Sequence, residues 1–146
     1  MRIITNIFFM LIIFNLISCK KKVDCNGDLV YEDGLTYYKG ELYTGNCESF
    51  FQNGNLMNQQ SYFKGMDDGI WYFYFENGQL ETKGEFIKNK KVNKWEYYYD
   101  SGALKQVSYY KNGLKDSIWL KFSNKGEILW EKKFKEDKQI NSNNNY

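Results

Sequence analysis

The sequence has no histidine and no proline, and its only arginine is Arg2. Without an imidazole, the chain lacks the side chain that most often transfers protons or binds metals near neutral pH. With a single arginine, it lacks the bidentate guanidinium clamps that hold carboxylates and phosphates. It also contains no glycine-rich phosphate loop, zinc-ligand spacing or nucleophile elbow. We therefore expect a protein that is not an enzyme, with no catalytic residue, cofactor or metal site.

Charge gives little indication of a partner. The chain has 20 lysine and arginine residues against 18 acidic residues, a formal net charge of +2 at pH 7. Domains that bind nucleic-acid phosphates usually carry a much larger positive charge, so we expect no nucleic-acid partner. Aromatic residues make up 19% of the chain, which supplies enough apolar area to exclude intrinsic disorder of the whole chain.

The first 18 residues are typical of an export signal. A mostly apolar run over residues 3–17 is shorter than the roughly 20 residues that span a bilayer. The run ends in Leu-Ile-Ser-Cys at 16–19, which resembles the bacterial lipobox. The resemblance implies a signal peptide over 1–18 and a lipid attached to Cys19. The alternative is an ordinary secretory signal followed by an unmodified cysteine.

A lipidated Cys19 would anchor the protein to a membrane. Several acyl chains bury enough methylene groups for durable attachment. Residues 19–34 are then expected to form a tether that begins to order near residues 29–31, and its lysines at 20–22 add attraction to anionic headgroups. The resemblance to lipoproteins associates an aspartate after the lipidated cysteine with retention in the inner membrane. Because a lysine follows Cys19, we expect an outer-membrane lipoprotein of the cell envelope, facing either the periplasm or the exterior.

Cys25 and Cys47 remain once Cys19 carries lipid. An even number of cysteines in an oxidising compartment favours a disulfide. The loop-entropy relation gives about 3 kcal/mol of stabilisation for a bridge across this separation. The alternative is a pair of buried free thiols.

The rest of the chain repeats itself every 24 residues. Trp71, Trp95 and Trp119 are one period apart, and Cys47 occupies the same place in an earlier copy. A fixed period of this length predicts a stacked repeat architecture. Further positions keep the step through successive copies: Phe50, Tyr74, Tyr98 and Phe122; Gly54, Gly78, Gly102 and Gly126; Leu56, Leu80, Leu104 and Ile128; Tyr62, Phe86, Tyr110 and Phe134.

Each repeat predicts a β-hairpin. In one copy, residues 70–76 form an aromatic-rich strand, Asn77-Gly78 supplies a two-residue type I′ turn, and residues 80–86 form the returning strand. Counting back from this turn places Trp71 opposite Gly84, whose missing side chain leaves space for the indole ring.

The same count places Phe75 opposite Leu80, on the face of the tryptophans. Tyr74 then points to the other face, unless a bulge re-aims it. Polar stretches over 64–69 and 88–93 are expected to be the turns between hairpins. The predicted core consists of residues at repeat-invariant positions: Trp71, Trp95, Trp119, Leu80, Leu104, Phe86 and Tyr110.

We therefore predict an all-β fold. Residues 35–140 should form an elongated antiparallel meander of about four stacked 24-residue hairpins, and residues 141–146 should be a disordered tail.

The spacing G-x-W-x-x-Y-x-x-x-G-x-L over 69–80 resembles the MORN-repeat variant of bacterial proteins, including those labelled as the YwqK family of toxin–antitoxin antitoxins. The segment 35–45 is similar to the opening half-repeat of such proteins. The resemblance implies a MORN-like fold over 35–134 and, as one function, an immunity or antitoxin protein that masks a cognate toxin. The glycine before tryptophan is missing at Asn93 and Ser117, where we expect differently shaped turns.

Aromatic residues that break the repeat are candidates for binding. Tyr72, for example, corresponds to Glu48, Glu96 and Leu120, so packing does not require a ring there. We expect a scaffold module that presents a binding face to an unidentified protein partner; the alternatives are neutralisation of a toxin and stacking of carbohydrate or peptidoglycan on exposed rings. The candidate binding residues are Tyr72, Tyr97, Tyr99, Tyr109 and Trp130.

Overall fold

The computed structural model describes residues 22–140, and the predicted signal peptide over 1–18, Cys19 and the tail over 141–146 lie outside this range. All regular elements of the described part are β-strands. Within these residues there is no helical candidate for a membrane span. A small sheet contains β2 (Leu29–Glu32), β3 (Leu35–Tyr38) and β4 (Glu41–Leu42). The main sheet contains β1 (Val23–Asp24), β5 (Gly45–Phe50), β6 (Leu56–Phe63), β7 (Met66–Asp67), β8 (Gly69–Tyr74), β9 (Leu80–Ile87), β10 (Lys90–Tyr98), β11 (Leu104–Lys111), β12 (Leu114–Phe122), β13 (Ile128–Lys135) and β14 (Lys138–Ile140).

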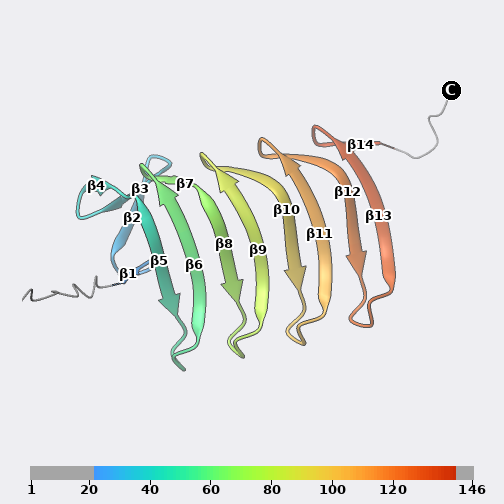
Figure 1. Cartoon of the computed structure of the whole chain (residues 1–146), viewed down its shortest axis with the longest axis horizontal. Helices are drawn as coiled ribbons and strands as arrows, with labels where there is room; N and C mark the ends of the chain where they lie inside the picture. The colour runs from blue at the N-terminus through green and yellow to red at the C-terminus, as the bar shows by residue number, and fades with distance from the viewer. Residues whose placement is uncertain (1–21, 141–146) are drawn as a thin grey trace, which may run out of the picture.

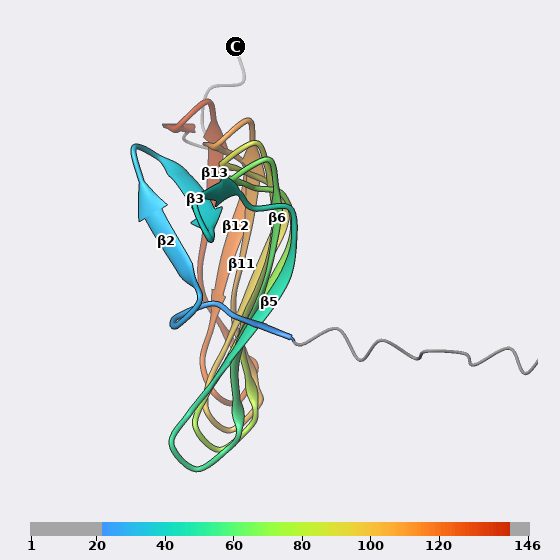
Figure 2. The same ribbon diagram turned by 90° about the vertical axis from the view of Figure 1, so that its left-hand side faces the viewer.

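The main sheet is a meander in which strands from β5 to β14 follow one another in chain order, with β7 paired only to β6 (Figure 1). Its hairpins are β5–β6, β8–β9, β10–β11 and β12–β13, all antiparallel. The predicted all-β fold of stacked 24-residue hairpins is therefore confirmed. Viewed nearly edge-on, the main sheet is a single layer, and the small sheet leans away from one side of it (Figure 2).

The segment predicted to be a tether becomes ordered earlier in the chain than expected. Val23 pairs with Cys47 in a short parallel bridge between β1 and β5. Further along, Leu29 pairs with Tyr38 in the small sheet. Backbone pairing and local turns order this segment against the first repeat.

The hairpin loops differ from the prediction. Of Asn77 and Gly78, only Gly78 has a positive φ, of 84°. Its backbone N–H donates to the carbonyl of Phe75 at 2.8 Å, and the N–H of Phe75 donates to the carbonyl of Gln79 at 2.8 Å. This is the geometry of a type I turn followed by a glycine bulge, not of a two-residue type I′ turn. As a result, Tyr74 rather than Phe75 pairs with Leu80.

The bulge moves the leucines to the other face of the sheet. Trp71 still pairs with Gly84, as predicted, but the register shifts by one residue between Phe73 and Tyr74. Leu80 therefore shares a face with Tyr74, away from Trp71, because directly opposed residues point the same way. The prediction that Leu80 and Leu104 belong to the tryptophan core is wrong for this reason.

The type I′ turns lie at the opposite end of the sheet. There, two-residue loops join consecutive strands, and both loop residues have positive φ. The predicted polar turns over 64–69 and 88–93 are consequently shorter, and most of the residues after each loop belong to strands. The loops are Lys64-Gly65, Lys88-Asn89, Asn112-Gly113 and Glu136-Asp137.

Asn93 and Ser117 are not turn residues but lie inside β10 and β12. Their φ values of 57° and 59° are positive, like the 106° of Gly69 at the equivalent position. The pairing of the strands shifts at both places, as expected of β-bulges. A positive φ is therefore kept in each copy, although its value is larger at the glycine than at Asn93 and Ser117.

An unbroken ladder of aromatic rings forms the core on one side of the sheet. Consecutive ring centroids are 4.9 to 6.1 Å apart. Trp95 and Trp119 are only 3% and 7% exposed although no second layer covers the whole sheet. Each ring is thus shielded from solvent by the adjacent rings, and the row of rings forms the hydrophobic core. The ladder consists of Tyr38, Tyr43, Tyr62, Trp71, Phe86, Trp95, Tyr110, Trp119 and Phe134.

Candidate functional site

The sheet has two chemically different faces. The tryptophan face carries the aromatic ladder. The other, which we name the leucine face, carries a row of apolar pairs in which an aromatic ring faces a leucine or isoleucine across each hairpin. Tyr74 and Tyr98 are half-buried in this row, and burial raises the pKa of both hydroxyls. The pairs are Phe50 with Leu56, Tyr74 with Leu80, Tyr98 with Leu104, and Phe122 with Ile128.

The structure does not bring the five predicted binding residues together. Tyr72 pairs with Lys83 and Tyr109 pairs with Lys94, both on the leucine face. Tyr72 also stacks on Tyr74, with ring centroids 6.5 Å apart. Only these two of the five remain candidates for a common surface.

The other three predicted residues lie elsewhere. Tyr97 is on the tryptophan face, 6.4 Å from the ring of Trp95, and burial raises its pKa. Trp130 pairs with Lys121 on the same face. Tyr99 lies in a hairpin loop, where its hydroxyl donates to the carbonyl of Phe122 at 2.8 Å and links two hairpins. The single binding face of five rings is therefore wrong, because side chains alternate between faces along each strand.

A hollow of about 590 Å³ lies on the leucine face across β10, β11 and β12. Its apolar wall includes Tyr109 and Ile118, which are 36% and 41% exposed. At its rim, the ammonium of Lys94 lies 2.8 Å from the carboxylate of Glu96, which raises the pKa of Lys94. The remaining lining residues are Leu104, Val107, Ser117 and Leu120.

Sequence reasoning found only part of this surface: it placed Tyr74 on the face opposite Trp71, but it assigned the leucines to the tryptophan face because it assumed the wrong hairpin loop. The signal was present: the aromatic position of Tyr74 is three residues after Trp71, out of phase with the tryptophan face. Its invariance across the copies indicated a second apolar row rather than an occasional exposed ring.

Two lysine side chains lie over rings in the later part of the aromatic ladder. The ammonium of Lys91 lies 4.0 Å from the centroid of Trp95, and that of Lys115 lies 5.1 Å from the centroid of Trp119. Burial lowers the pKa of Lys91. These cation–π contacts stabilise the ladder and occupy the space above its rings.

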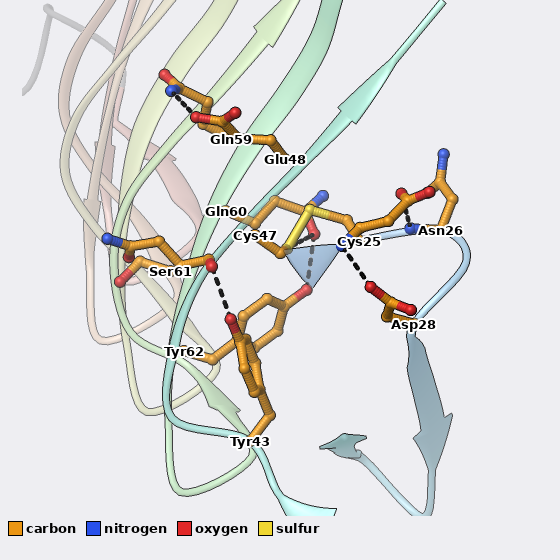
Figure 3. The surroundings of a disulfide bond; sticks show 12 residues. Cys25, Asn26, Asp28, Tyr43, Cys47, Glu48, Gln59, Gln60, Ser61 and Tyr62 are labelled. Carbon is orange, nitrogen blue, oxygen red and sulfur yellow. Dashed lines mark hydrogen bonds between the residues drawn. A yellow bond between two sulfur atoms is a disulfide. The ribbon is translucent and has the colours of Figure 1, made fainter. Parts of the chain in front are cut away.

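The two cysteines that the sequence analysis paired, Cys25 and Cys47, are joined by a disulfide with Cα atoms 5.1 Å apart (Figure 3). Cys47 is 1% exposed and packs in a small cluster with Tyr43 and Tyr62. The hydroxyl of Tyr43 donates to the carbonyl of Asn46 at 2.6 Å, and that of Tyr62 donates to Oε1 of Gln60 at 2.7 Å. The bridge fastens the segment after β1 to the first hairpin.

No group of three or more potential metal ligands occurs within residues 22–140. Comparison with protein families finds the MORN repeat variant at residues 43–64, 67–88 and 91–112. The second and third stretches begin two residues after a type I′ loop, and all three stretches end at the first residue of the next loop. The chain thus contains three MORN-variant repeats, and the hairpin β12–β13 continues the same geometry. No functionally curated protein matches the chain.

Proposed function

We propose that this chain is a non-enzymatic protein-interaction module that binds a protein partner through its leucine face. MORN repeats are consistent with a repeat-based interaction module. The observation that carries the proposal is the hollow beside Tyr109 and Leu120, on a single-layered sheet whose described residues leave it uncovered. Contiguous exposed apolar surface on a soluble domain is typical of an interface.

The repeats themselves separate binding from folding at this hollow. Leu120 corresponds to Glu48 and Glu96, and Tyr109 corresponds to Ser61 and Glu85. The same sheet position therefore accepts a charged side chain in another copy. The apolar choice at β11 and β12 is not required for the hairpin, which supports a role in contacting a partner.

The two alternatives differ in their support. An antitoxin role rests on the family resemblance and would use the leucine face with a toxin as its partner. Carbohydrate stacking gains no support from the tryptophan face, because Trp95 and Trp119 are buried and lysine ammonium groups lie over their rings.

The proposed location rests on the predicted lipid at Cys19. The described part begins at Lys22, beside β1 at one end of the strand order. An anchor at Cys19 would hold the sheet by this end, and both faces would remain accessible at the membrane surface. We propose an outer-membrane attachment on this basis, with a protein of the cell envelope as partner.

A photocrosslinking residue at Leu120 or Lys121 tests the binding face in living cells. The two positions are neighbours on β12, but Leu120 pairs with Val107 on the leucine face whereas Lys121 pairs with Gln106 on the tryptophan face. We expect a discrete protein adduct from position 120 and none from position 121. Adducts of equal yield, or from position 121 alone, would refute the assignment of the face.

A further inference from the structure

A second hollow, of about 350 Å³, lies between the small sheet and the first repeats on the tryptophan face. Its walls combine aromatic rings with hydrogen-bonding groups and one acid. The rings are those of Tyr31, Tyr62 and Trp71, and the polar side chains are those of Gln60, Thr36 and Asp67. The leucine face plays no part in this site, so it stands apart from the proposed partner interface.

Asp67 occupies a repeat position that holds lysine in the next two copies. It lies opposite Tyr62 in the β6–β7 pair, as Lys91 lies opposite Phe86 and Lys115 lies opposite Tyr110. Each of these residues follows a type I′ turn and points to the tryptophan face. Asp67 therefore places a negative charge at a repeat position where the next two copies place the positive charges of Lys91 and Lys115.

In the later copies, the lysine supplies the cation of a cation–π pair. Lys91 lies over Trp95 and Lys115 lies over Trp119, at 4.0 and 5.1 Å from the ring centroids. In the copy over 67–88, the carboxylate of Asp67 instead lines the same hollow as Trp71. Within residues 22–140 the ion pairs are Lys22 with Glu48 and Lys94 with Glu96, so no described lysine neutralises Asp67.

The surroundings of Asp67 favour a cation from outside the chain. The residue is only partly exposed, and burial raises the pKa of its carboxyl. Residues 23–37, which supply four residues of the lining, carry four acidic side chains and no lysine. This concentration of negative charge near the hollow attracts small cations toward it.

We infer that the hollow binds an alkylammonium group, which lies over the ring of Trp71 and forms an ion pair with Asp67. The ligand would replace the lysine that the later repeats provide from their own chain. Aromatic rings together with a carboxylate are a recurrent way to hold an organic ammonium ion. The amine could belong to a small free molecule or to a lysine side chain of a peptide.

The indole N–H signals of the chain's four tryptophans report on this site by NMR. The indole of Trp71 donates to the carbonyl of Ser61 at 3.0 Å, which fixes its position. Titration of the purified full chain with butylammonium chloride should shift this signal saturably and leave that of Trp119 in place. The neutral analogue 1-butanol, and sodium chloride at equal ionic strength, should have no such effect. A peptide with one internal lysine tests the second source of the amine.

Two substitutions of Asp67 separate binding from folding. Asp67→Asn keeps the shape but removes the charge, and should weaken butylammonium binding at least about tenfold. Asp67→Lys restores the repeat pattern, so it should abolish binding while the melting temperature stays the same or rises. A response to butylammonium alone identifies a small amine as the ligand, and a response to the peptide identifies a protein segment.

Three outcomes would overturn the inference. The first is the absence of any saturable shift at Trp71 with both amines. The second is an equal response to 1-butanol, which would make the hollow a nonspecific apolar site. The third is unchanged affinity in the folded Asp67→Asn and Asp67→Lys proteins.

Discussion

Trp95 lies directly over Gly84: a Cβ atom placed on this glycine would be only 2.1 Å from Cδ2 of the indole. The sequence analysis assigned this space to Trp71, the pairing partner of Gly84 within its own hairpin. The ring that fills it comes instead from the next hairpin, across the β9–β10 pair. Each indole of the ladder therefore joins one repeat to another, which is how nearest-neighbour coupling arises in a repeat protein.

Gly84→Ala should accordingly destabilise the protein by about 1–3 kcal/mol, the usual cost of overpacking. Trp95 is 3% exposed and has little room to move away. Urea denaturation would measure the change in unfolding free energy. Combining Gly84→Ala with Trp95→Phe should recover part of the loss, whereas Trp71→Phe should not. Recovery by Trp71→Phe alone would contradict the observed contact.

Much of the architecture could be predicted because the 24-residue period can be recognised without knowing the conformation of the loops. The face of the sheet on which each side chain lies was harder to predict, because it depends on the loop type. Trp71 and Phe86 were placed correctly, but Leu80 was not, since one extra residue in the bulged strand reverses a face. Asn-Gly suits a type I′ turn and also a type I turn with a bulge, and the sequence around Gly78 does not distinguish them.

The candidate site was predicted only in part for the same reason. Tyr72 and Tyr109 lie on the leucine face, but Tyr97 points to the opposite side of the sheet. Repeat variability showed which rings were dispensable for the fold, without showing the direction in which each one points. The acid at Asp67 was passed over because it lay in a stretch expected to be a solvated turn, whereas the structure places it beside the aromatic ladder.

Alkaline pH should destabilise the fold through its buried tyrosines. Burial raises the pKa of Tyr97 above its ordinary value of 10.0. The folded pKa then exceeds the unfolded one, so the contribution of this hydroxyl is fully present below about pH 10 and is lost as the pH rises further. Tyr97→Phe should reduce the loss of unfolding free energy between about pH 9 and 11.

The matched control is Tyr31→Phe, at a ring that is 75% exposed. Its pH profile should follow that of the parent. Lys91, whose pKa is lowered by burial, acts in the opposite direction but is present in all three proteins. Identical profiles for the parent and for Tyr97→Phe would show that ionisation of Tyr97 is not coupled to folding.

Reduction of the Cys25–Cys47 disulfide should lower the free energy of unfolding by about 3 kcal/mol, as expected for a bridge across this separation. Denaturant titrations with and without reductant give the difference. Cys25→Ser should be equally destabilised and should no longer respond to reductant. If thiol titration of the unreduced parent protein finds free thiols at Cys25 and Cys47, the disulfide is absent and the prediction fails.

Cys19→Ala tests the predicted anchor. Without the sulfur that accepts the diacyl group, the protein should remain an unprocessed precursor and incorporate no labelled palmitate. Cys25→Ser is the control, because it removes a different cysteine and should leave labelling intact. A Cys19→Ala protein that is still labelled, and still fractionates with the outer membrane, would show that the lipoprotein prediction is wrong.

Charged substitutions in the hollow of the leucine face should abolish partner binding and leave the fold intact. Tyr109→Glu repeats the acid found at Glu85, and Leu120→Lys places a cation opposite Glu131 across the β12–β13 pair. We therefore expect melting temperatures within a few degrees of the parent, since surface changes of this kind usually alter stability by less than about 0.5 kcal/mol.

Binding should respond differently, because a charge in the middle of an apolar interface loses its hydration without gaining a partner. In cells that carry a photocrosslinking residue at Val107, each variant should reduce the yield of the specific adduct at least about tenfold. Lys121→Glu introduces a charge on the same strand but on the tryptophan face, and should keep the adduct. If the leucine-face variants are folded and give the parental adduct at full yield, the partner does not bind at this hollow. If Lys121→Glu alone abolishes the adduct, the tryptophan face also contributes to binding, and the assignment of the interface to the hollow is wrong.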